Sequence, residues 1–420
     1  MKWPWQRREV KESATAQVGV VNMPAMTFGK KKPEDYAKEG YQKNAIVFKC
    51  VNAISTAAAR VPFKLFNGDR EVETHPVLDL LQRPNPVTGQ YEFFEALYSF
   101  LLITGDSFLE RVSVGRGIRE MYILPPQNIE VKPGRSQIPS EYIFVAGQSK
   151  VRFGVDPVSG QSDILQIKLF NPIDPWRGQS PLQAAGISVD THNLAGQWLA
   201  SLLNNNAVPS GALVYKPADN IDMTEDQRRQ LEKILDQKFS GSQNAGRPMV
   251  LGNGLEWVSF GATPKDMGAV QIKESEAVAI AQAYDVPAQL VGVAAASTFS
   301  NMQEAREWLY TNAVLNLVEQ VRTELNHWLL PAFGPGLRLE VDKDSIDALE
   351  SVRARRRQSV IEMVAAGLIS VNEGRETLGF GPVSGGDQVL VPAGRLPLDF
   401  EAMPGSDEIR TAAELLGYER

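Results

Sequence analysis

The sequence has few of the residues that bind metals or form disulfides. Its 420 residues include one cysteine, Cys50, and three histidines, His75, His192 and His327. A single cysteine excludes an intrachain disulfide and fits a protein made in a reducing compartment. The histidines are far apart and have no cysteine or histidine at ligand spacing, so we expect no structural zinc site. No metal and no cofactor are expected.

Long apolar runs are also missing. The longest uncharged stretch, residues 191–215, contains three consecutive asparagines and a proline, which the core of a bilayer would penalise heavily. A second uncharged stretch, residues 286–303, is rich in small residues and also contains a proline. The basic N-terminus, MKWPWQRREVKE, is not followed by an apolar run. We therefore expect neither a membrane segment nor a secretory signal.

The motifs of common enzymes are absent. The only Gly-Lys pair, Gly29-Lys30, lacks the upstream glycine of a Walker A loop, and no G-x-S-x-G, H-E-x-x-H or C-x-x-C pattern occurs. Residues 342–344, Asp-Lys-Asp, could bind a divalent cation, but solvated charges at a helix start are the better interpretation. An enzyme is therefore not expected. A carboxylate-based hydrolase is the alternative, although no motif identifies a pair among the 50 acidic residues.

The net charge of −7 is unevenly distributed. The first sixty residues carry eleven Lys and Arg against five Asp and Glu, a net of +6, so the other 360 residues carry −13. Tight binding to nucleic acid phosphates needs clustered cations. A net-acidic chain is therefore a poor candidate for gripping nucleic acid.

The first part of the chain predicts a mixed body of helices and strands. Apolar residues recur at helical spacing over 45–60, 77–81 and 91–103. Residues 63–66 and 71–73 predict a hairpin around the Asn67-Gly68 turn. From 105 to 170, short alternating segments separated by Gly and Pro predict antiparallel sheet.

Two long helices, over 180–206 and 264–284, flank a small strand-helix-strand module. A flexible loop and a helix of about 45 Å over 301–330 follow, then a strand and helices over 345–366 and 371–378. One face of the long helix is apolar: Met302, Ala305, Leu309, Ala313, Leu317, Val321, Leu325 and Trp328. The sequence therefore predicts an α+β fold with a projecting stalk. Such a stalk cannot bury its own faces in a monomer, so we expect an oligomer.

Seven stretches, in order along residues 40–380, resemble the portal (head–tail connector) proteins of tailed bacteriophages and related prophages, of the siphophage or prophage type. They are GYQKNAIVFKCVNAIS from 40, HPVLDLLQRPNP from 75, FLLITGDSFLERV from 100, WRGQSPLQAA from 176, NNNAVPSGALV from 204, GNGLEWVSFGATPKDM from 252, and IAQAYDVPAQLVGV with STFSNMQEAREWLY from 280 to 310. Each stretch alone is weak, whereas the ordered set is specific.

The resemblance implies a portal-like fold that assembles as a ring, usually of twelve subunits. It assigns residues to a wing (36–179 and 301–341), two stem helices (180–206 and 264–287), a clip (207–263), a tunnel loop (288–300) and a crown (342–380). Composition and charge predict a flexible N-terminal arm (1–35) and an acidic, loosely ordered tail (381–420) outside these parts. No catalysis and no membrane contact are implied.

The implied function is to form the channel through which double-stranded DNA is packaged and ejected, at one vertex of the capsid. The DNA passes through without recognition of its sequence. The implied partners are the other subunits of the ring, the terminase large subunit, a head–tail adaptor, and the major capsid and scaffold proteins. The implied location is the virion, after synthesis in the cytoplasm of a bacterial host. Another head–tail connector component is the alternative, but adaptors are commonly much shorter.

The resemblance also assigns residues to sites. In the tunnel loop they are Val291, Val293, Ala294, Ala295, Ser297, Thr298 and Phe299; on the stem, Lys265 and Lys273; on the clip, Glu225, Asp226, Arg228, Arg229, Glu232 and Lys233; in the crown, Arg353, Arg355, Arg356 and Arg357. An uncharged loop would let DNA slide, although a plain linker has the same composition. The stem lysines could line the channel or pair between subunits, and the clip and crown charges could equally be solvated faces or, in the crown, intersubunit ion pairs.

Overall fold

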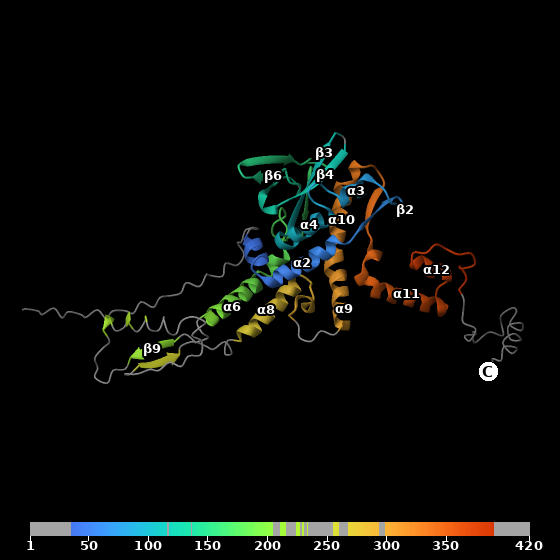
Figure 1. The fold of residues 1–420 in the computed structure, drawn as a ribbon. Coiled ribbons are helices and arrows are strands. Elements are labelled where there is room, and N and C mark those ends of the chain that lie inside the picture. The colour runs from blue at the N-terminus through green and yellow to red at the C-terminus, as the bar shows by residue number, and fades with distance from the viewer. Residues whose placement is uncertain are drawn as a thin grey trace, which may run out of the picture.

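The computed structural model describes residues 35–115, 117–135, 137–204, 211–215, 224–226, 229–230, 233, 255–259, 268–293 and 299–389. Figure 1 shows a central body of helices and sheets, a pair of helices that projects from it, and a C-terminal helical arm that extends from another side. The expected N-terminal arm and most of the acidic tail lie outside the described residues.

Three helices form the centre of the body: α2 (Ala45–Ala59), α4 (Gln90–Thr104) and α10 (Leu315–Trp328). The periodicity of their apolar residues predicts them, and the buried faces of α2 and α4 meet in one core. The thiol of Cys50 is fully buried there, as expected for a small core residue. Helix α4 ends where Gly105 takes a left-handed conformation with φ 84°.

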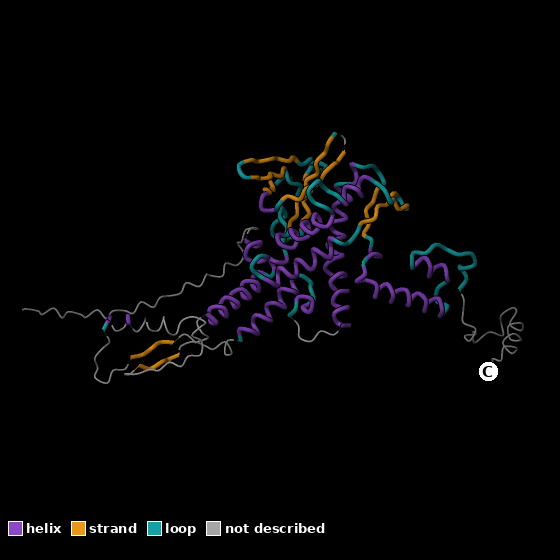
Figure 2. The backbone as a smooth tube through the Cα atoms, viewed as in Figure 1, coloured by secondary structure: helices purple, strands orange, loops and turns teal. Residues whose placement is uncertain are grey.

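The strands form antiparallel sheets around these helices, as the sequence predicts (Figure 2). The order is β11-β1-β2 in one sheet, β4-β3-β8 in a second and β5-β6-β7 in a third. The strands are β1 (Phe63–Asn67), β2 (Arg70–Val72), β3 (Asp106–Val114), β4 (Gly117–Leu124), β5 (Ile129–Lys132), β6 (Glu141–Ala146), β7 (Ser149–Gly154), β8 (Ile164–Lys168) and β11 (Leu337–Val341). Strand β7 lies within the region 105–170 for which the sequence predicts antiparallel sheet, although nearly all of its residues are exposed.

The projecting pair consists of α6 (Gly186–Asn204) and α8 (Ala269–Ala283), which lie side by side (Figures 1 and 2). The sequence predicts one helix from 180, whereas the structure has a short α5 (Pro181–Ala184) and a one-residue break before α6. Beyond the pair, β9 (Gly211–Tyr215) and β10 (Leu255–Ser259) form the expected two-stranded sheet. The expected helix between them lies mostly outside the described residues.

The long helix expected over 301–330 is present but is not uniform. It comprises α9 (Phe299–Trp308), a π-helical segment η5 (Leu309–Val314) and α10. The predicted apolar face is inside, with Met302 and Ala313 only half-buried. In the π-helical segment Leu309 and Val314 are both buried, and a period of 3.6 does not predict this irregularity.

Short helices complete the fold. They are η1 (Tyr36–Tyr41), α3 (Pro76–Gln82), η2 (Pro126–Asn128), η4 (Ala288–Val291), η6 (Leu330–Ala332), η7 (Lys343–Ser345) and η8 (Asp347–Leu349). The arm then consists of α11 (Glu350–Ala365) and α12 (Val371–Thr377). The helix predicted from 345 therefore begins five residues later, after two 3-10 turns. Among the described helices, none is long and apolar enough to cross a membrane.

Candidate functional site

The helix pair α6 and α8 projects beyond the core of the body (Figure 1). The place where this pair is attached to the body is the candidate site. Helix α8 enters the core through Ile280 and Ala281, both fully buried. Just after it, the hydroxyl of Tyr284 donates to the carbonyl of Leu102 on α4 at 3.4 Å. Apolar packing therefore fixes the base of α8.

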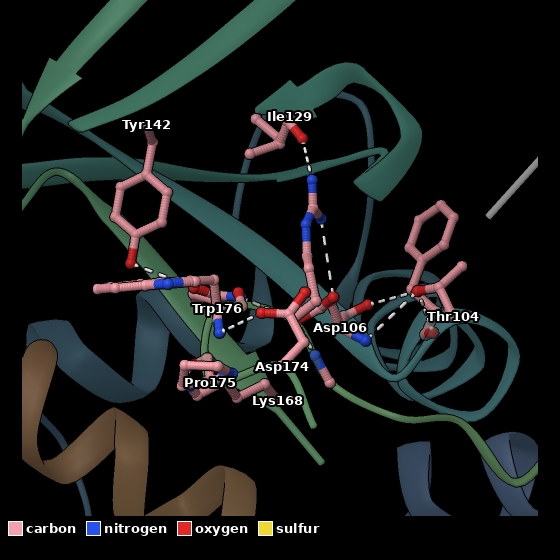
Figure 3. Close-up of polar contacts among 12 residues, drawn as sticks. Thr104, Asp106, Ile129, Tyr142, Lys168, Asp174, Pro175 and Trp176 are labelled. Carbon is pink, nitrogen blue, oxygen red and sulfur yellow. Dashed lines mark hydrogen bonds and ion pairs between the residues drawn. The ribbon is translucent and has the colours of Figure 1, made fainter. Parts of the chain in front are cut away.

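The segment that leads into α5 and α6 is held instead by a buried carboxylate (Figure 3). Asp106, at the start of β3, is 3% exposed, and its Oδ1 accepts from Gln166 Nε2 at 2.8 Å and from the Gly178 amide at 3.0 Å. Arg177 Nη1 lies 3.7 Å from Asp106 Oδ2. Its other terminal nitrogen donates to the carbonyl of Ile129. One aspartate therefore joins two strands to the chain entering the stem.

The charge on Asp106 is poorly solvated. Burial raises the pKa of its carboxyl, and Gln166, Arg177 and the Gly178 amide, which act in the opposite direction, do not fully offset this effect. The guanidinium of Arg177 also lies 5.4 Å from the centre of the Phe108 ring. Asp106 therefore acts mainly as a hydrogen-bond acceptor.

Two glycines allow the backbones to cross at this point. A Cβ atom added at Gly105 would lie 2.6 Å from the carbonyl carbon of Gly178, and one added at Gly178 would overlap the carbonyl of Gly105. No side chain fits on either residue without moving the main chain. We call Asp106, Arg177, Gly105 and Gly178 the aspartate joint.

The loop before the aspartate joint is also ordered by hydrogen bonds (Figure 3). Asn171 accepts from the amides of Ile173 and Asp174, and Asp174 accepts from the Trp176 amide at 2.8 Å. Lys168 Nζ donates to the carbonyl of Pro175. Side-chain hydrogen bonds therefore fix the loop from which the chain continues into α5 and α6.

The sequence analysis did not identify the aspartate joint. Asp106 and Arg177 are 71 positions apart, and each is unremarkable in its own segment. The available signal was that both lie in stretches that carry the resemblance, GDSF and WRGQSP. The structure brings these two stretches into contact.

The residues predicted for the tunnel loop are only partly described. Val291 ends η4 and packs against the main core, and Val293 is half-buried. Phe299 is the first residue of α9 and not part of a loop. The others, Ala294, Ala295, Ser297 and Thr298, lie outside the described residues.

Of the predicted stem and clip charges, the structure describes five. Lys273, on α8, is half-buried against α6, with its Nζ 4.0 Å from the Cβ position of Gly196. The exposed clip residues are Glu225, Asp226, Arg229 and Lys233. The other candidates, Lys265, Arg228 and Glu232, lie outside the described residues.

The four predicted crown arginines all lie on α11 and all have partners within the chain. Arg353 and Arg357 bind Glu350 at 2.7 and 2.6 Å, and hydrogen bonds from these two arginines lower the pKa of its carboxyl. Arg356 donates to the carbonyl of Thr377 at 2.9 Å. Arg355 binds Glu307 on α9, whose other oxygen accepts from Ser351 at 2.9 Å. Intrachain pairing was not among the interpretations that we considered from the sequence.

A polar cleft of about 440 Å³ lies beside β1, β11 and α10, and bears on the hydrolase alternative. Two of its carboxylates lie beside cations: Lys64 Nζ is 3.4 Å from Asp342, and Lys343 Nζ is 3.0 Å from Glu319. Burial acts to raise the pKa of Glu319, but hydrogen bonds from Lys343 and Arg322 lower it overall. A general acid needs a raised pKa, so Glu319 is not poised for that role. The described residues contain no group of three or more potential metal ligands.

Comparisons with known proteins identify the class. The fold matches the neck of an empty gene transfer agent (GTA) particle, computed with C6 symmetry, with a TM-score of 0.67, 35% identity and coverage of 85% of this chain and 96% of that one. It matches the neck of the native GTA particle, computed with C12 symmetry, with a TM-score of 0.65 at the same identity and coverage. The chain therefore has the fold of a particle neck protein.

Sequence comparison gives the family. The family described as phage portal protein matches residues 45–379. The portal protein of Enterobacteria phage HK97 is 25% identical over 370 residues, 84% of this chain and 82% of that protein. The chain belongs to the phage portal protein family, a family of structural proteins. The α+β portal fold and the portal function predicted from the sequence are thereby confirmed.

Proposed function

We propose that this protein forms a ring of twelve subunits at one vertex of a capsid, and that double-stranded DNA enters and leaves through the centre of the ring. One observation carries the proposal: the chain aligns with 96% of a chain from a C12-symmetric particle neck, at 35% identity. Twelve copies in closed symmetry would also cover the stem surfaces that a monomer leaves exposed.

The charges of the stem suit a channel in which DNA slides. Helix α6 has one charged residue, Asp190, and α8 has Lys273, Glu274 and Glu276. Each phosphate contact by a cation releases counterions and strengthens binding, so a surface with one lysine and three carboxylates holds DNA weakly. The stem therefore supports passage and not retention of DNA.

The narrowest part of the channel is assigned to the loop between η4 and α9. Val291 packs on the core and Phe299 begins α9, so we assign the lining to the residues between them, Val293, Ala294, Ala295, Ser297 and Thr298. These side chains are uncharged. Lys265 and Lys273 are retained as candidates for the stem lining.

The proposed partners are those that the resemblance to portal proteins implies for each part of the chain. The clip, residues 207–263, is proposed to dock the terminase large subunit during packaging and the head–tail adaptor afterwards. The wing faces the major capsid and scaffold proteins, and the crown, residues 342–380, lies inside the head. The assembled protein is a virion component made in the cytoplasm of a bacterial host.

Native mass measurement with negative-stain imaging of the full chain tests the proposal. We expect a ring with a central channel and a mass near twelve times the 46.2 kDa of the chain. Coexpression with scaffold and capsid proteins is the second arm, because it supplies the surfaces on which rings nucleate. A species that stays monomeric or dimeric at high concentration in both arms would refute the proposal.

The likeness to GTA necks favours a gene-transfer particle over a lytic phage as the structure that contains this portal. The matches at 35% identity, which cover 85% of this chain, are to chains of GTA particles. Sequencing the nuclease-protected DNA of particles that contain this chain decides the point. Reads spread over the chromosome of the producing cell are expected, and reads from one phage genome would contradict it.

A further inference from the structure

A second joint links the stem to the body, and its centre is Asn44. This residue lies at the N-cap of α2 and is 1% exposed. Its Oδ1 accepts from the amides of Ile46 and Val47 at 3.0 and 3.1 Å. Its Nδ2 lies 3.1 Å from Nδ1 of His192 and donates to Oδ1 of Asn193 at 2.9 Å. Both of the latter residues belong to α6.

The capping bonds fix the orientation of the Asn44 amide. Two backbone N–H groups need an acceptor, so the oxygen must face α2 and the NH₂ group must face α6. The two hydrogens of that group then point to two acceptors, and one of these is Nδ1 of His192. Nδ1 can accept only when it carries no proton, so the imidazole must be neutral with its hydrogen on Nε2.

The surroundings of His192 favour this neutral form. Burial lowers the pKa of the imidazole, and the charge of Lys273 on α8 lowers it further. The hydrogen bond with Asn193 and the charge of Glu276 on α8 act in the opposite direction but do not outweigh them. On the side of η1, Asn193 Nδ2 donates to the carbonyl of Glu39 at 3.2 Å.

We propose that Asn44 positions the stem helix α6 on the body, and that this contact holds only while His192 is neutral. Protonation of Nδ1 would place an N–H against the N–H of Asn44, which cannot turn away without leaving two amides of α2, one of them buried, without their acceptor. The joint therefore opens on acidification. The claim that the opening changes the channel rests on the proposed portal function, whereas the contact itself belongs to the single subunit.

Asn44→Asp is a variant that reverses the sign of the effect. Aspartate caps helices as well as asparagine does, so the bonds to α2 are retained. Its second oxygen, however, would accept from a protonated Nδ1 and repel a neutral one. We expect the pKa of His192 to lie below the ordinary histidine value of 6.5 in the wild-type protein and above it in Asn44→Asp.

The test is an NMR titration of the full chain with labelled histidine, together with hydrogen exchange of α6 at pH 7.5 and pH 5.5. The chain has three histidines, so His192→Gln and His327→Gln assign the signals. His192→Gln keeps an acceptor but cannot be protonated, and should abolish the faster exchange of α6 at the lower pH. His327 is exposed on α10, and its substitution should leave that response intact.

Two results would overturn the proposal. One is a His192 titration whose midpoint is the same in the wild-type protein and in Asn44→Asp. The other is a pH response of α6 that persists in His192→Gln, which stands even if the Asn44 variant does not fold. Neither readout requires a ring, so failure of the portal proposal, seen as the absence of rings, is distinguished from failure of this one.

Discussion

Replacing Asp106 by alanine tests how the aspartate joint holds the stem. The change removes the acceptor of the buried Gly178 amide, and an unsatisfied buried donor costs about 1–3 kcal/mol. Gln166 keeps its bond to the carbonyl of Trp176, and Arg177 keeps the Ile129 carbonyl and some access to water. The loss of Asp106 therefore costs less free energy at Gln166 and Arg177 than it would at fully buried partners with no other hydrogen bond. We expect a total loss of about 2–4 kcal/mol in the free energy of unfolding.

Asp106→Asn separates the role of the acceptor from that of the charge. Burial raises the pKa of the Asp106 carboxyl, so the folded state disfavours the ionised form. The contribution of Asp106 to stability is therefore greatest at low pH and falls as the pH rises from the ordinary aspartate value through the raised value in the folded state. Asparagine keeps the shape and one acceptor oxygen, and should cost no more than about 1 kcal/mol at pH 7 while removing this pH dependence.

Urea unfolding of the full chain, with both midpoint and slope, measures these differences. Arg152→Ala is the matched control, because the Arg152–Glu141 pair is an ion pair of 3.4 Å at the surface of the same body. Such a pair contributes about 0–1 kcal/mol. If Asp106→Ala costs no more than this control, or Asp106→Asn costs as much as Asp106→Ala, the reasoning about the joint is wrong.

Three other changes probe separate parts of the fold. Gly178→Ala should lower the free energy of unfolding by about 1–3 kcal/mol or more, because no side chain fits there. Gly186→Ala, whose added Cβ meets nothing within 4 Å, should lower it by less than about 0.5 kcal/mol, and equal effects in urea unfolding would contradict the close approach. Glu307→Gln should weaken the bond to Arg355 and speed hydrogen exchange in α11 with little change in global stability, and unchanged exchange would show that this contact does not hold the arm. Burial raises the pKa of the Cys50 thiol to about 12, so we expect no reaction with a thiol reagent at pH 8 until the chain is unfolded, and rapid labelling of the native protein would disprove it.

The body could be predicted from the sequence where one physical signal dominates. Helix α2 has apolar residues at helical spacing, and an asparagine at its N-cap marks its start. The hairpin of β1 and β2 follows from its Asn-Gly turn. These elements depend on neighbours in the sequence, and local patterns therefore suffice.

The stem joints could not be predicted because they depend on residues that are distant in the sequence. Asn44 looks like a helix cap and nothing more, yet its amide reaches His192, 148 positions away. Arg177 and Asp106 are 71 positions apart and belong to no common local pattern. The crown arginines combine both cases: Arg353 pairs with Glu350, three positions before it, as helical spacing allows, whereas Glu307, the partner of Arg355, is 48 positions away.

The two polar joints act together with the apolar base of α8, and closure of the proposed ring sets how precisely they must hold the stem. In a closed ring each interface is the same, so any error in the shape of the subunit is repeated around the circle. A ring of twelve turns by about 30° per subunit, whereas rings of eleven and thirteen turn by about 33° and 28°, so a change of about 2–3° selects another size. Hydrogen bonds weaken steeply only when their angle falls below about 120°, so the bonds of Asp106 and Asn44 cannot by themselves fix an angle to about 2–3°. In the proposed ring these bonds would select which surfaces of stem and body meet, and the close-packed apolar contacts of Ile280 and Ala281 would limit the movement that is left.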